Sequence, residues 1–253
     1  MITLKKIENI NYANTDCEQQ TLDIYLPDTD IFPVYIFFHG GGLESGSKSD
    51  YSFFENLQKQ GIATVSANYR LYPNVKYPEF LEDSAMAVSW VFDNISNFGK
   101  ASAYFIGGIS AGGYIAYMLC FDKKYLGKYG INPDKTAGYI FDAGQPTTHF
   151  NVLRERGIDT RRIIVDSAAP LYHITQERNY PPMLIFSAEH DMPNRYEQTL
   201  LLMSAMKTFG YDTQKIKFKY IKNSTHCQYV DKTNIIDGKS YADILCEFIK
   251  ENM

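Results

Sequence analysis

Cysteine is scarce in this 253-residue chain, and the spacing of its cysteines matches neither a C-x-x-C pair nor a zinc site. The first residues also lack the apolar core of a secretory signal. We therefore expect a cytoplasmic protein in a reducing compartment, with a secreted form left open if a leader has been removed. The four cysteines, which form neither a C-x-x-C pair nor a zinc-ligand spacing, are Cys17, Cys120, Cys227 and Cys246.

Long apolar runs and an excess of one charge are missing as well. No run approaches the roughly 18 apolar residues of a membrane span. The net charge of −4 arises from interspersed acidic and basic residues, which leaves no electrostatic footprint for nucleic acid or an anionic membrane. We expect a small-molecule partner, no nucleic acid and no membrane span, and the sequence leaves a homo-oligomer open.

Motifs for metal ions and nucleotides are absent too. The chain holds no H-x-x-x-H pair and no paired acidic motif. The glycine run Gly40–Gly42 is not followed by the lysine and serine or threonine of a phosphate-binding P-loop. We therefore expect chemistry that needs neither a metal nor a cofactor.

The chain does have the composition of a globular protein, with 45% hydrophobic and 21% charged residues. Short apolar runs without alternation recur along it, as in a parallel sheet that helices cover on both faces. Helical patterns separate these runs, so the order of elements predicts a doubly wound α/β domain. The expected strands are 2–12, 21–26, 33–38, 61–67, 102–106, 137–141, 182–186 and, half exposed at an edge, 216–221; the expected helices are about 50–60, 79–97, 111–121, 194–209 and 239–251.

Residues 144–180 do not fit this alternation. They separate two apolar strands by far more than the roughly 2–6 residues of a typical connection. A long excursion on the carboxyl side of a parallel sheet is where a substrate-covering lid is built. A covering helix with irregular flanks explains the length equally well. We expect one domain over residues 1–253, with 144–180 as a candidate lid.

A serine between glycines, in the stretch Gly108-Ile109-Ser110-Ala111-Gly112, lies between a predicted buried strand and a predicted apolar helix. At such a strand-to-helix turn the serine takes a strained backbone conformation and needs tiny neighbours. Gly108, Ala111 and Gly112 meet that need. The motif alone also describes an ordinary turn, but its position between strand and helix predicts that Ser110 is a nucleophile.

Three glycines follow the predicted strand 33–38 in the stretch His39-Gly40-Gly41-Gly42. Backbone N–H groups that no side chain obstructs can point at an oxygen that becomes negative during acyl transfer. The end of a strand in a parallel sheet is where ligands bind, which favours an oxyanion hole over a flexible turn. We expect His39 to hold this loop by hydrogen bonding.

A serine hydroxyl needs a base to become a good nucleophile, and the base needs an orienting carboxylate. Of the five histidines, His226 lies in a polar loop before the last helix and after every candidate acid. Asp191 lies just past the apolar strand 182–186. The order serine, aspartate, histidine is that of the α/β-hydrolases. We therefore predict Ser110, Asp191 and His226 as catalytic residues, with Glu189 as the second choice of acid.

Three segments, together with Asp83, extend these motifs into a family resemblance. From about residue 20 onward the chain resembles the hormone-sensitive-lipase-like and carboxylesterase branches of the α/β-hydrolase superfamily. The resemblance implies the α/β-hydrolase fold, a mostly parallel sheet of about eight strands with helices on both faces. The segments are His39-Gly40-Gly41-Gly42, Asn68-Tyr69-Arg70-Leu71-Tyr72-Pro73 and Gly108-Ile109-Ser110-Ala111-Gly112-Gly113.

The same resemblance implies roles for individual residues. It implies Ser110 as the nucleophile, Asp191 as the acid and His226 as the base. The N–H groups of three further residues would form the oxyanion hole. Because the N-terminal helical cap of the lipase-like branch is missing, the chain is similar to compact acetyl- and feruloyl-type esterases and to kynurenine-formamidase-like enzymes. The oxyanion-hole residues are Gly41, Gly42 and Ala111.

The candidate lid brings further residues near the site. If 144–180 covers the substrate, we expect Phe150, Arg161, Arg162 and Tyr172 to line its acyl or alcohol side. Surface arginines and packed aromatic rings are the alternative interpretation of these residues. Directly after the predicted base comes Cys227, which we interpret as a packing residue.

The leading hypothesis is a serine hydrolase that cleaves carboxylic esters, short-chain or acetyl esters above all, through an acyl-enzyme on Ser110. The same residues could instead cleave an amide, such as an N-formyl arylamine. The alternative from another class is a protein that binds a ligand on a hydrolase scaffold without turnover. Such proteins commonly lose a catalytic residue, whereas this chain has all three.

Overall fold

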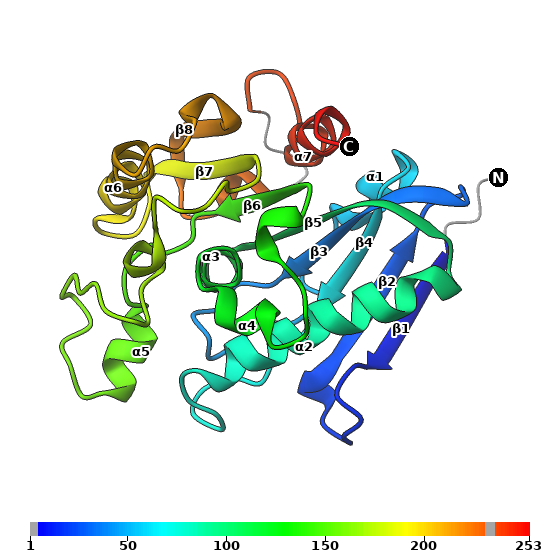
Figure 1. Ribbon diagram of the computed structural model, residues 1–253, viewed down its shortest axis with the longest axis horizontal. Coiled ribbons are helices and arrows are strands. Elements are labelled where there is room, and N and C mark those ends of the chain that lie inside the picture. Colours follow the sequence, from blue (N-terminus) through cyan, green and yellow to red (C-terminus); the bar gives the residue numbers. More distant parts are fainter. Residues whose placement is uncertain (1–4, 231–235) are drawn as a thin grey trace.

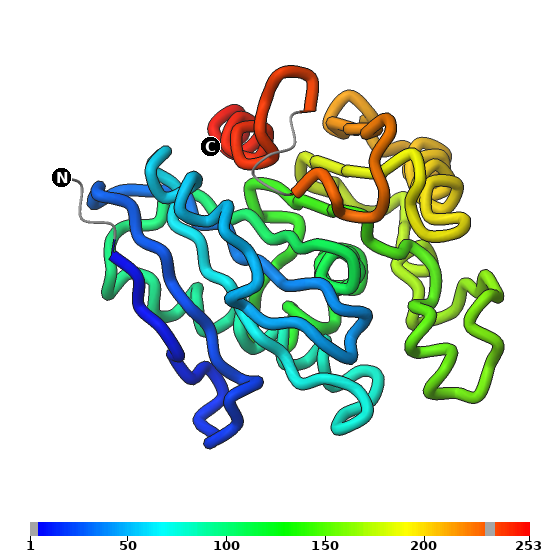
Figure 2. Tube along the Cα trace, turned by 180° about the vertical axis from the view of Figure 1, so that it is seen from behind, coloured from blue at the N-terminus to red at the C-terminus, as the bar shows by residue number. Residues whose placement is uncertain are grey.

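The framework of the computed structural model, which describes residues 5–230 and 236–253, is an eight-stranded sheet. The order β1-β2-β4-β3-β5-β6-β7-β8 puts β1 and β8 at the two edges. Figure 2 shows the blue N-terminal strands and the orange β8 at opposite ends of the sheet. The strands are β1 (Lys5–Asn11), β2 (Thr21–Leu26), β3 (Ile31–Phe38), β4 (Ala63–Ala67), β5 (Lys100–Ile109), β6 (Gly138–Asp142), β7 (Met183–His190) and β8 (Ile216–Thr225).

Most of the sheet is parallel. Only β1 with β2 and β2 with β4 pair in the antiparallel sense among the described strands, and the pairs from β4 through β3 to β8 are all parallel. The carboxyl ends of β3, β5, β6, β7 and β8 therefore meet at one edge, where the loops that follow them come together.

Helices cover both faces of the sheet (Figure 1). Side chains of α2, α3, α4 and α6 belong to one hydrophobic core, and those of α1 and α7 belong to the other. A capping box between Ser240 and Asp243 starts α7. The helices are α1 (Phe54–Lys59), α2 (Glu79–Asn94), α3 (Ala111–Phe121), α4 (Lys123–Gly127), α5 (Phe150–Glu155), α6 (Arg195–Thr208) and α7 (Tyr241–Glu251).

The packing of β3 on both of its faces explains why its sequence is apolar without alternation. Val34 and Ile36 pack into the core beneath α2 and α3, whereas Tyr35 and Phe37, which point to the opposite face, pack against α1. Because successive side chains of a strand point to opposite faces, a strand covered on both sides needs an apolar residue at every position. The predicted doubly wound α/β class with a mostly parallel sheet is confirmed.

The limits of some elements differ from the expected ones. The predicted opening strand begins at Lys5 in the structure, and its residues 2–4 lie outside the described part of the chain. Strand β8 continues to Thr225, which pairs with His190 after a register shift, although its last residues are polar. An edge strand needs apolar side chains on one face only, so hydrophobicity underestimates its length.

Residues 144–180, hereafter the 144–180 segment, contain α5, a 3-10 turn at Pro170–His173 and otherwise irregular backbone. In both views the part with α5 extends beyond the layers of the sheet (Figures 1 and 2). Its first residues are nevertheless buried, among them Gln145, Thr147 and His149. The base of the segment is thus part of the packed interior, while its outer loop lies at the surface.

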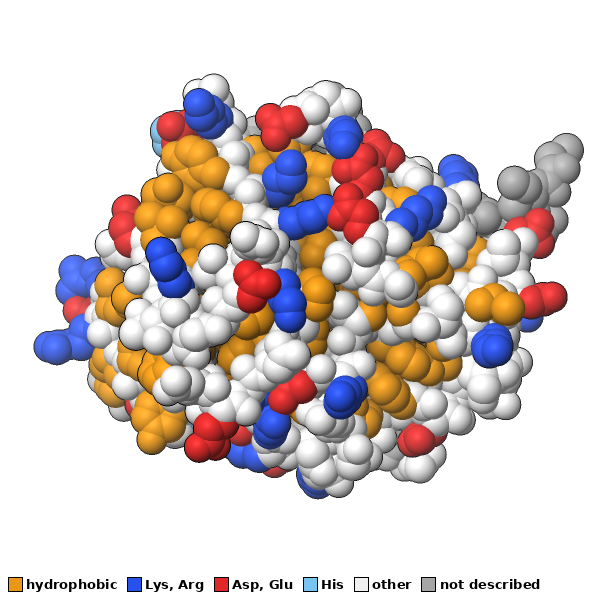
Figure 3. Space-filling model, turned by 45° about the horizontal axis from the view of Figure 1, so that its top comes forward, with side chains coloured by type: hydrophobic (Ala, Val, Ile, Leu, Met, Phe, Trp, Pro, Cys, Tyr) orange, Lys and Arg blue, Asp and Glu red, His pale blue; other side chains and the backbone are white. Residues whose placement is uncertain are grey.

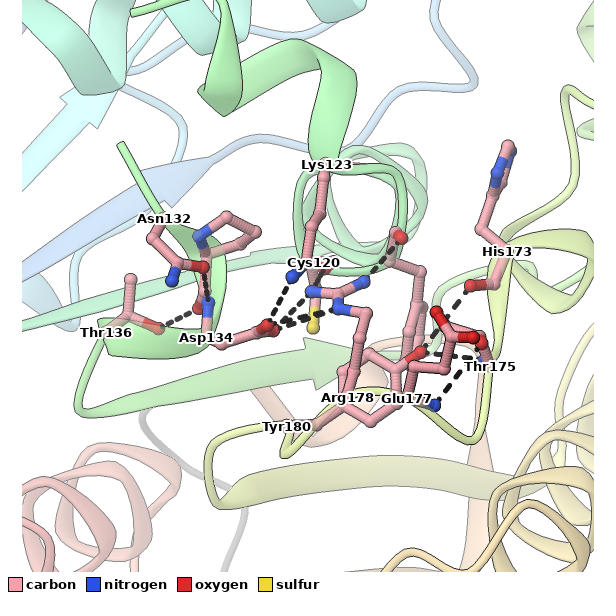
Figure 4. A network of polar contacts seen from close by, with 12 residues as sticks. Cys120, Lys123, Asn132, Asp134, Thr136, His173, Thr175, Glu177, Arg178 and Tyr180 are labelled. Atoms are coloured by element: carbon pink, nitrogen blue, oxygen red, sulfur yellow. Dashed lines mark hydrogen bonds and ion pairs between the residues drawn. The ribbon is translucent and has the colours of Figure 1, made fainter. Parts of the chain in front are cut away.

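Arg178 fastens the end of the 144–180 segment to α3 (Figure 4). Its guanidinium donates to the carbonyl oxygens of Cys120 at 2.7 Å and Phe121 at 2.6 Å, and it forms an ion pair with Asp134. The guanidinium also lies 4.3 Å from the ring centroid of Tyr180. The last carbonyls of a helix lack partners within the helix and attract cations. Arg178 thereby fixes the path from the segment back to β7.

The surface mixes charges of both signs. Figure 3 shows acidic and basic side chains interspersed over the face in view, in keeping with a net charge of −4. Within the described parts of the chain, no helix is both long and apolar enough to cross a membrane.

Candidate active site

Ser110 occupies a sharp turn between β5 and α3. Its φ of 56° and ψ of −112° lie where non-glycine residues rarely occur. Its N–H donates to the backbone carbonyl of Asp142 at 2.7 Å, which ties the turn to the end of β6. A Cβ at Gly108 would lie 2.5 Å from the backbone of Gly112. The glycines are therefore required by the close approach of backbone at this turn.

Three side chains from three strand ends meet at this turn. The Oγ of Ser110 lies 2.8 Å from Nε2 of His226, which directly follows β8. The Nδ1 of the same ring lies 2.5 Å from Oδ1 of Asp191, which directly follows β7. The structure thus brings together the three residues that the sequence predicts as nucleophile, base and acid.

Electrostatics favours one arrangement of protons in this chain of contacts. Burial alone would raise the pKa of Asp191, but hydrogen bonds from His226 and from the N–H of Met192, with the nearby charge of Arg195, bring it below its ordinary value. Asp191 is therefore ionised at neutral pH and accepts a hydrogen bond from Nδ1 of His226, which carries the proton. The Nε2 atom is left free to accept the hydroxyl of Ser110.

The other candidates for base and acid have different partners. His149 is buried and caps α5 by accepting the N–H of Asn151, and burial lowers its pKa well below the ordinary value. His173 contacts the carbonyl of Ser167 at 2.9 Å, and His190 is exposed. Glu189, the second choice of acid, accepts the N–H of Asn223 at 2.7 Å. None of these residues contacts Ser110 or His226 in the described structure.

The glycine loop after β3 wraps over the same site. Gly41 and Gly42 have φ values of 108° and 65°, which favour glycine. The ring of His39 stacks on Tyr69 at 4.4 Å between centroids, and its Nδ1 lies 2.7 Å from the carbonyl oxygen of Gly40. Burial lowers the pKa of His39 to about 4, so its ring is neutral at pH 7. His39 therefore holds the loop by packing and hydrogen bonding, in agreement with its expected role.

Two residues that the sequence analysis missed also position this loop. The hydroxyl of Tyr51 accepts the N–H of Gly40 at 3.1 Å, and the side-chain amide of Asn151 donates to the carbonyl of Gly42 at 2.7 Å. Among residues 5–230 and 236–253, no acceptor takes the N–H groups of Gly41, Gly42 or Ala111. The three N–H groups predicted as the oxyanion hole therefore have no hydrogen-bond partner in the described structure, and their role stays a prediction.

A buried carboxyl group lies beneath the site. Asp142, at the end of β6, accepts a hydrogen bond from the hydroxyl of Tyr229. Burial nevertheless raises the pKa of Asp142 to about 7. Its position directly after the apolar run 137–141 was the only signal in the sequence. Cys227 next to the base has a pKa that burial raises well above its ordinary value, which agrees with its interpretation as a packing residue.

A cavity of about 340 Å³ opens between the 144–180 segment and the residues from Met192 into α6 that follow Asp191, and the catalytic residues themselves do not line it. The ring of Phe150 lies against Gly42 on one side, where a Cβ would be 3.2 Å from it. Three of the four residues expected to line the substrate line this cavity, whereas Tyr172 is 61% exposed and does not. The lining residues are Gln145, Phe150, Arg154, Thr160, Arg161, Arg162, Ile163, Met192, Pro193, Asn194, Arg195 and Gln198.

No cluster of three or more histidine, cysteine, aspartate or glutamate residues that could hold a metal ion occurs in the parts of the chain that the structure describes.

Two solved structures are similar to the chain over nearly its whole length. A truncated carbohydrate esterase from gut microbiota has a TM-score of 0.79 at 19% identity and covers 98% of this chain and 96% of that one. This chain has the α/β-hydrolase fold. The propionate-bound esterase Est2 of Thermogutta terrifontis has a TM-score of 0.73 at 22% identity, covering 99% of this chain and 94% of that one.

Sequence relatives of this chain agree with the solved structures. The BD-FAE family matches residues 22–130, the part that carries the glycine loop and Ser110. Esterase LipC of Mycobacterium tuberculosis is 27% identical over 187 residues, which cover 66% of this chain and 46% of that protein. The chain spans about half the length of the curated relatives it matches, from 41% to 64% for three of them. The predicted resemblance to the carboxylesterase branch of the superfamily is confirmed.

Proposed function

We propose that the protein is a serine hydrolase of carboxylic esters, with short-chain or acetyl esters as its preferred substrates. One observation carries the proposal: the unbroken contact from Ser110 through His226 to Asp191, at 2.8 Å and 2.5 Å. A partly buried hydroxyl on a strained turn, an imidazole nitrogen that accepts from it and an ionised carboxylate behind the imidazole are the parts that acyl transfer needs.

In the proposed mechanism, Oγ of Ser110 bonds to the ester carbonyl carbon while Nε2 of His226 takes the hydroxyl proton. The carbonyl oxygen becomes negative and accepts hydrogen bonds from Gly41, Gly42 and Ala111. The bond to the alcohol oxygen then breaks, and His226 gives its proton to the leaving alcohol. A water molecule activated by His226 attacks the acyl-enzyme in the same way and releases the acid.

The relatives support an ester over an amide as substrate. Several are named as esterases or carboxylesterases, among them the carboxylesterase NlhH of Mycobacterium tuberculosis. One, the gibberellin receptor GID1A of Arabidopsis thaliana, is named as a receptor and represents the binding alternative. The intact contact between Ser110 and His226 favours turnover, because a protein that only binds has no need of an aligned base.

Hydrolysis of 4-nitrophenyl acetate and butyrate by the purified protein tests the proposal. We expect Ser110→Ala to lower kcat by roughly 10⁴-fold or more, because the nucleophile is lost. A fluorophosphonate probe should label the natural protein and leave the variant unlabelled. Hydrolysis of both esters by Ser110→Ala at the natural rate, or a natural protein that neither cleaves nor takes up the probe, would contradict the proposed function.

We also propose that the 144–180 segment covers part of the substrate within a single domain. Its residues Phe150, Arg161 and Arg162 line the cavity beside the glycine loop, which supports this role.

We propose that the protein works in a reducing compartment, the cytoplasm. The absence of disulfides among its four cysteines supports this proposal.

A further inference from the structure

Arg195 is a buried cation without an ion pair. Its exposed fraction is 3%, yet no carboxylate of the described residues lies within 4 Å of its guanidinium. Burial lowers the pKa of Arg195, and an arginine nevertheless keeps its proton at neutral pH. The carboxylate of Asp191 is near enough to interact with this charge, but it does not contact the guanidinium, so the N–H donors of Arg195 must find other partners.

The hydrogen bonds of Arg195 leave part of its guanidinium without a strong partner. The Nη1 group donates to the carbonyl oxygen of Ala143. The Nη2 group has only long contacts, 3.4 Å to Oε1 of Gln145 and 3.7 Å to the sulfur of Met192. Gln145, Met192 and Arg195 all line the 340 Å³ cavity, so the residue that carries this weakly satisfied donor borders a space that a ligand can enter.

Three more arginines line the same cavity, and they differ in their partners. Arg154 binds both carboxylate oxygens of Glu44, and Arg161 binds both of Asp159. The side chain of Arg162 has no hydrogen bond or ion pair with any residue in the described ranges. Arg162 at the rim and Arg195 at the floor are therefore the two arginines of the cavity that no carboxylate of the described residues contacts, although Asp159 and Asp191 are near enough to interact with them.

The first turn of α6 adds a weaker contribution of the same sign. Asn194 precedes the helix and makes no side-chain cap, and Asn194, Arg195 and Gln198 line the cavity. The beginning of a helix carries a partial positive charge and unpaired N–H groups. The remaining wall is partly apolar, with Phe150, Ile163 and others, which suits a short hydrocarbon chain that carries a charged end.

We propose that this cavity binds a carboxylate group of the substrate, so that the preferred ester carries a negative charge a few carbon atoms from the bond that is cleaved. The inference rests on the proposed ester hydrolysis and names its substrate class. Arginine suits this task because its planar guanidinium matches the two oxygens of a carboxylate. Arg195 supplies the buried contact, and Arg162 attracts the group at the entrance.

Matched esters that differ in charge test the inference. One pair is 4-nitrophenyl hydrogen adipate and its methyl ester, with the charge on the acyl side. The other is 4-acetoxybenzoate and its methyl ester, with the charge on the alcohol side. In at least one pair we expect kcat/KM to favour the anion by about tenfold at low salt, as charge-assisted hydrogen bonds do. The favoured pair also identifies the part of the ester that enters the cavity.

Arg162→Gln and Arg161→Gln form a matched pair of neighbouring variants. We expect Arg162→Gln to lower the ratio of kcat/KM for anionic over neutral ester about threefold, and 0.5 M NaCl to have a similar effect on the natural protein. Arg161→Gln should keep the ratio, because its guanidinium is already bound to Asp159. Arg195→Gln should abolish the preference. If that variant does not fold, the comparison of Arg162→Gln with Arg161→Gln still decides.

The possible failures are distinguishable. If neutral and anionic esters are cleaved equally well, the inference is wrong and the proposed function stands. If no ester is cleaved, the proposed function fails, and calorimetric binding of methyl hydrogen adipate against dimethyl adipate to the natural protein decides the inference. Binding that prefers the anion and weakens in Arg162→Gln supports the carboxylate site, and binding without preference overturns it.

Discussion

Gly112 shows how little room surrounds the turn at Ser110. A Cβ on this residue would lie 1.9 Å from the carbonyl oxygen of Phe38 and 2.7 Å from that of His39. Both carbonyls belong to the backbone where β3 runs into the glycine loop. The nucleophile and the oxyanion loop are thus pressed together at a point where only a hydrogen atom fits.

Alanine substitutions at two glycines test this crowding. We expect Gly112→Ala to lower the free energy of unfolding by roughly 2–4 kcal/mol and to lower kcat, because the backbone of β3 or α3 must move. Gly127→Ala is the control, since a Cβ there meets nothing within 4 Å in α4. It should change stability by less than about 1 kcal/mol, toward greater stability. Urea unfolding and ester hydrolysis measure both effects, and equal stability of the two variants would contradict the crowding.

The sequence predicts some of these residues and misses others for a physical reason. Ser110, Asp191 and His226 follow apolar or edge strands in a fixed order, so their meeting at one edge could be predicted. Tyr51 and Asn151 act on backbone atoms of the glycine loop. Such contacts depend on how two distant segments pack, and they leave no spacing pattern in the chain.

At the scale of elements, α5 holds the glycine loop in position through one hydrogen bond and one ion pair. It belongs to the 144–180 segment, yet its Asn151 is 2% exposed and reaches the carbonyl of Gly42. Arg154, one turn further on, forms an exposed ion pair with Glu44 in the same loop. The buried hydrogen bond contributes more than the exposed ion pair, which is worth about 0–1 kcal/mol.

Loss of the hydrogen bond from Asn151 to Gly42 should impair catalysis more than substrate binding. We expect Asn151→Ala to lower kcat for 4-nitrophenyl acetate roughly tenfold with little change in KM, because the proposed donor at Gly42 loses its fixed position. Stopped-flow and steady-state kinetics separate the two constants. Asn94→Ala is the matched control, because Asn94 makes the same kind of bond, to the carbonyl of Trp90 in α2, away from the site. A variant at Asn151 that keeps the natural kcat would show that α5 does not position the loop.

The limits of the elements follow the same logic. The strands inside the sheet were predictable because both of their faces are apolar, as in β3 and β6. The polar end of β8 and the short helix α4 were not, since an edge position and a five-residue helix place little demand on the sequence. The cavity beside α5 could not be predicted either, because it arises from side chains of segments far apart in the chain.

At the scale of the whole molecule, Asp142 couples stability to pH. An unfolded aspartate loses its proton near pH 4, whereas burial raises the pKa of Asp142 to about 7 in the folded protein. Between these values the folded state holds more protons than the unfolded state, so this group lowers the free energy of unfolding as the pH rises. The full penalty is reached above pH 7.

Asp142→Asn removes this penalty and keeps an oxygen that can accept from Tyr229. We expect the variant to match the natural protein near pH 4 and to exceed its free energy of unfolding at pH 8 by a margin on the order of 4 kcal/mol at most. Urea unfolding at both pH values measures the margin. Tyr229→Phe should act in the opposite sense, because it removes a hydrogen bond that favours the ionised carboxyl. A margin that is the same at both pH values would falsify this account.

The three proposed catalytic side chains follow β5, β7 and β8, in the order in which the ribosome makes them. Ser110 and the glycine loop are synthesised well before the base, and β8, which ends directly before His226, is the last of the described strands to be synthesised. A growing chain therefore carries an unassisted serine until its final strand has docked. Hydrolytic activity would thus begin only after β8 and His226 have been synthesised, and its first appearance during translation would mark the moment at which β8 pairs with β7.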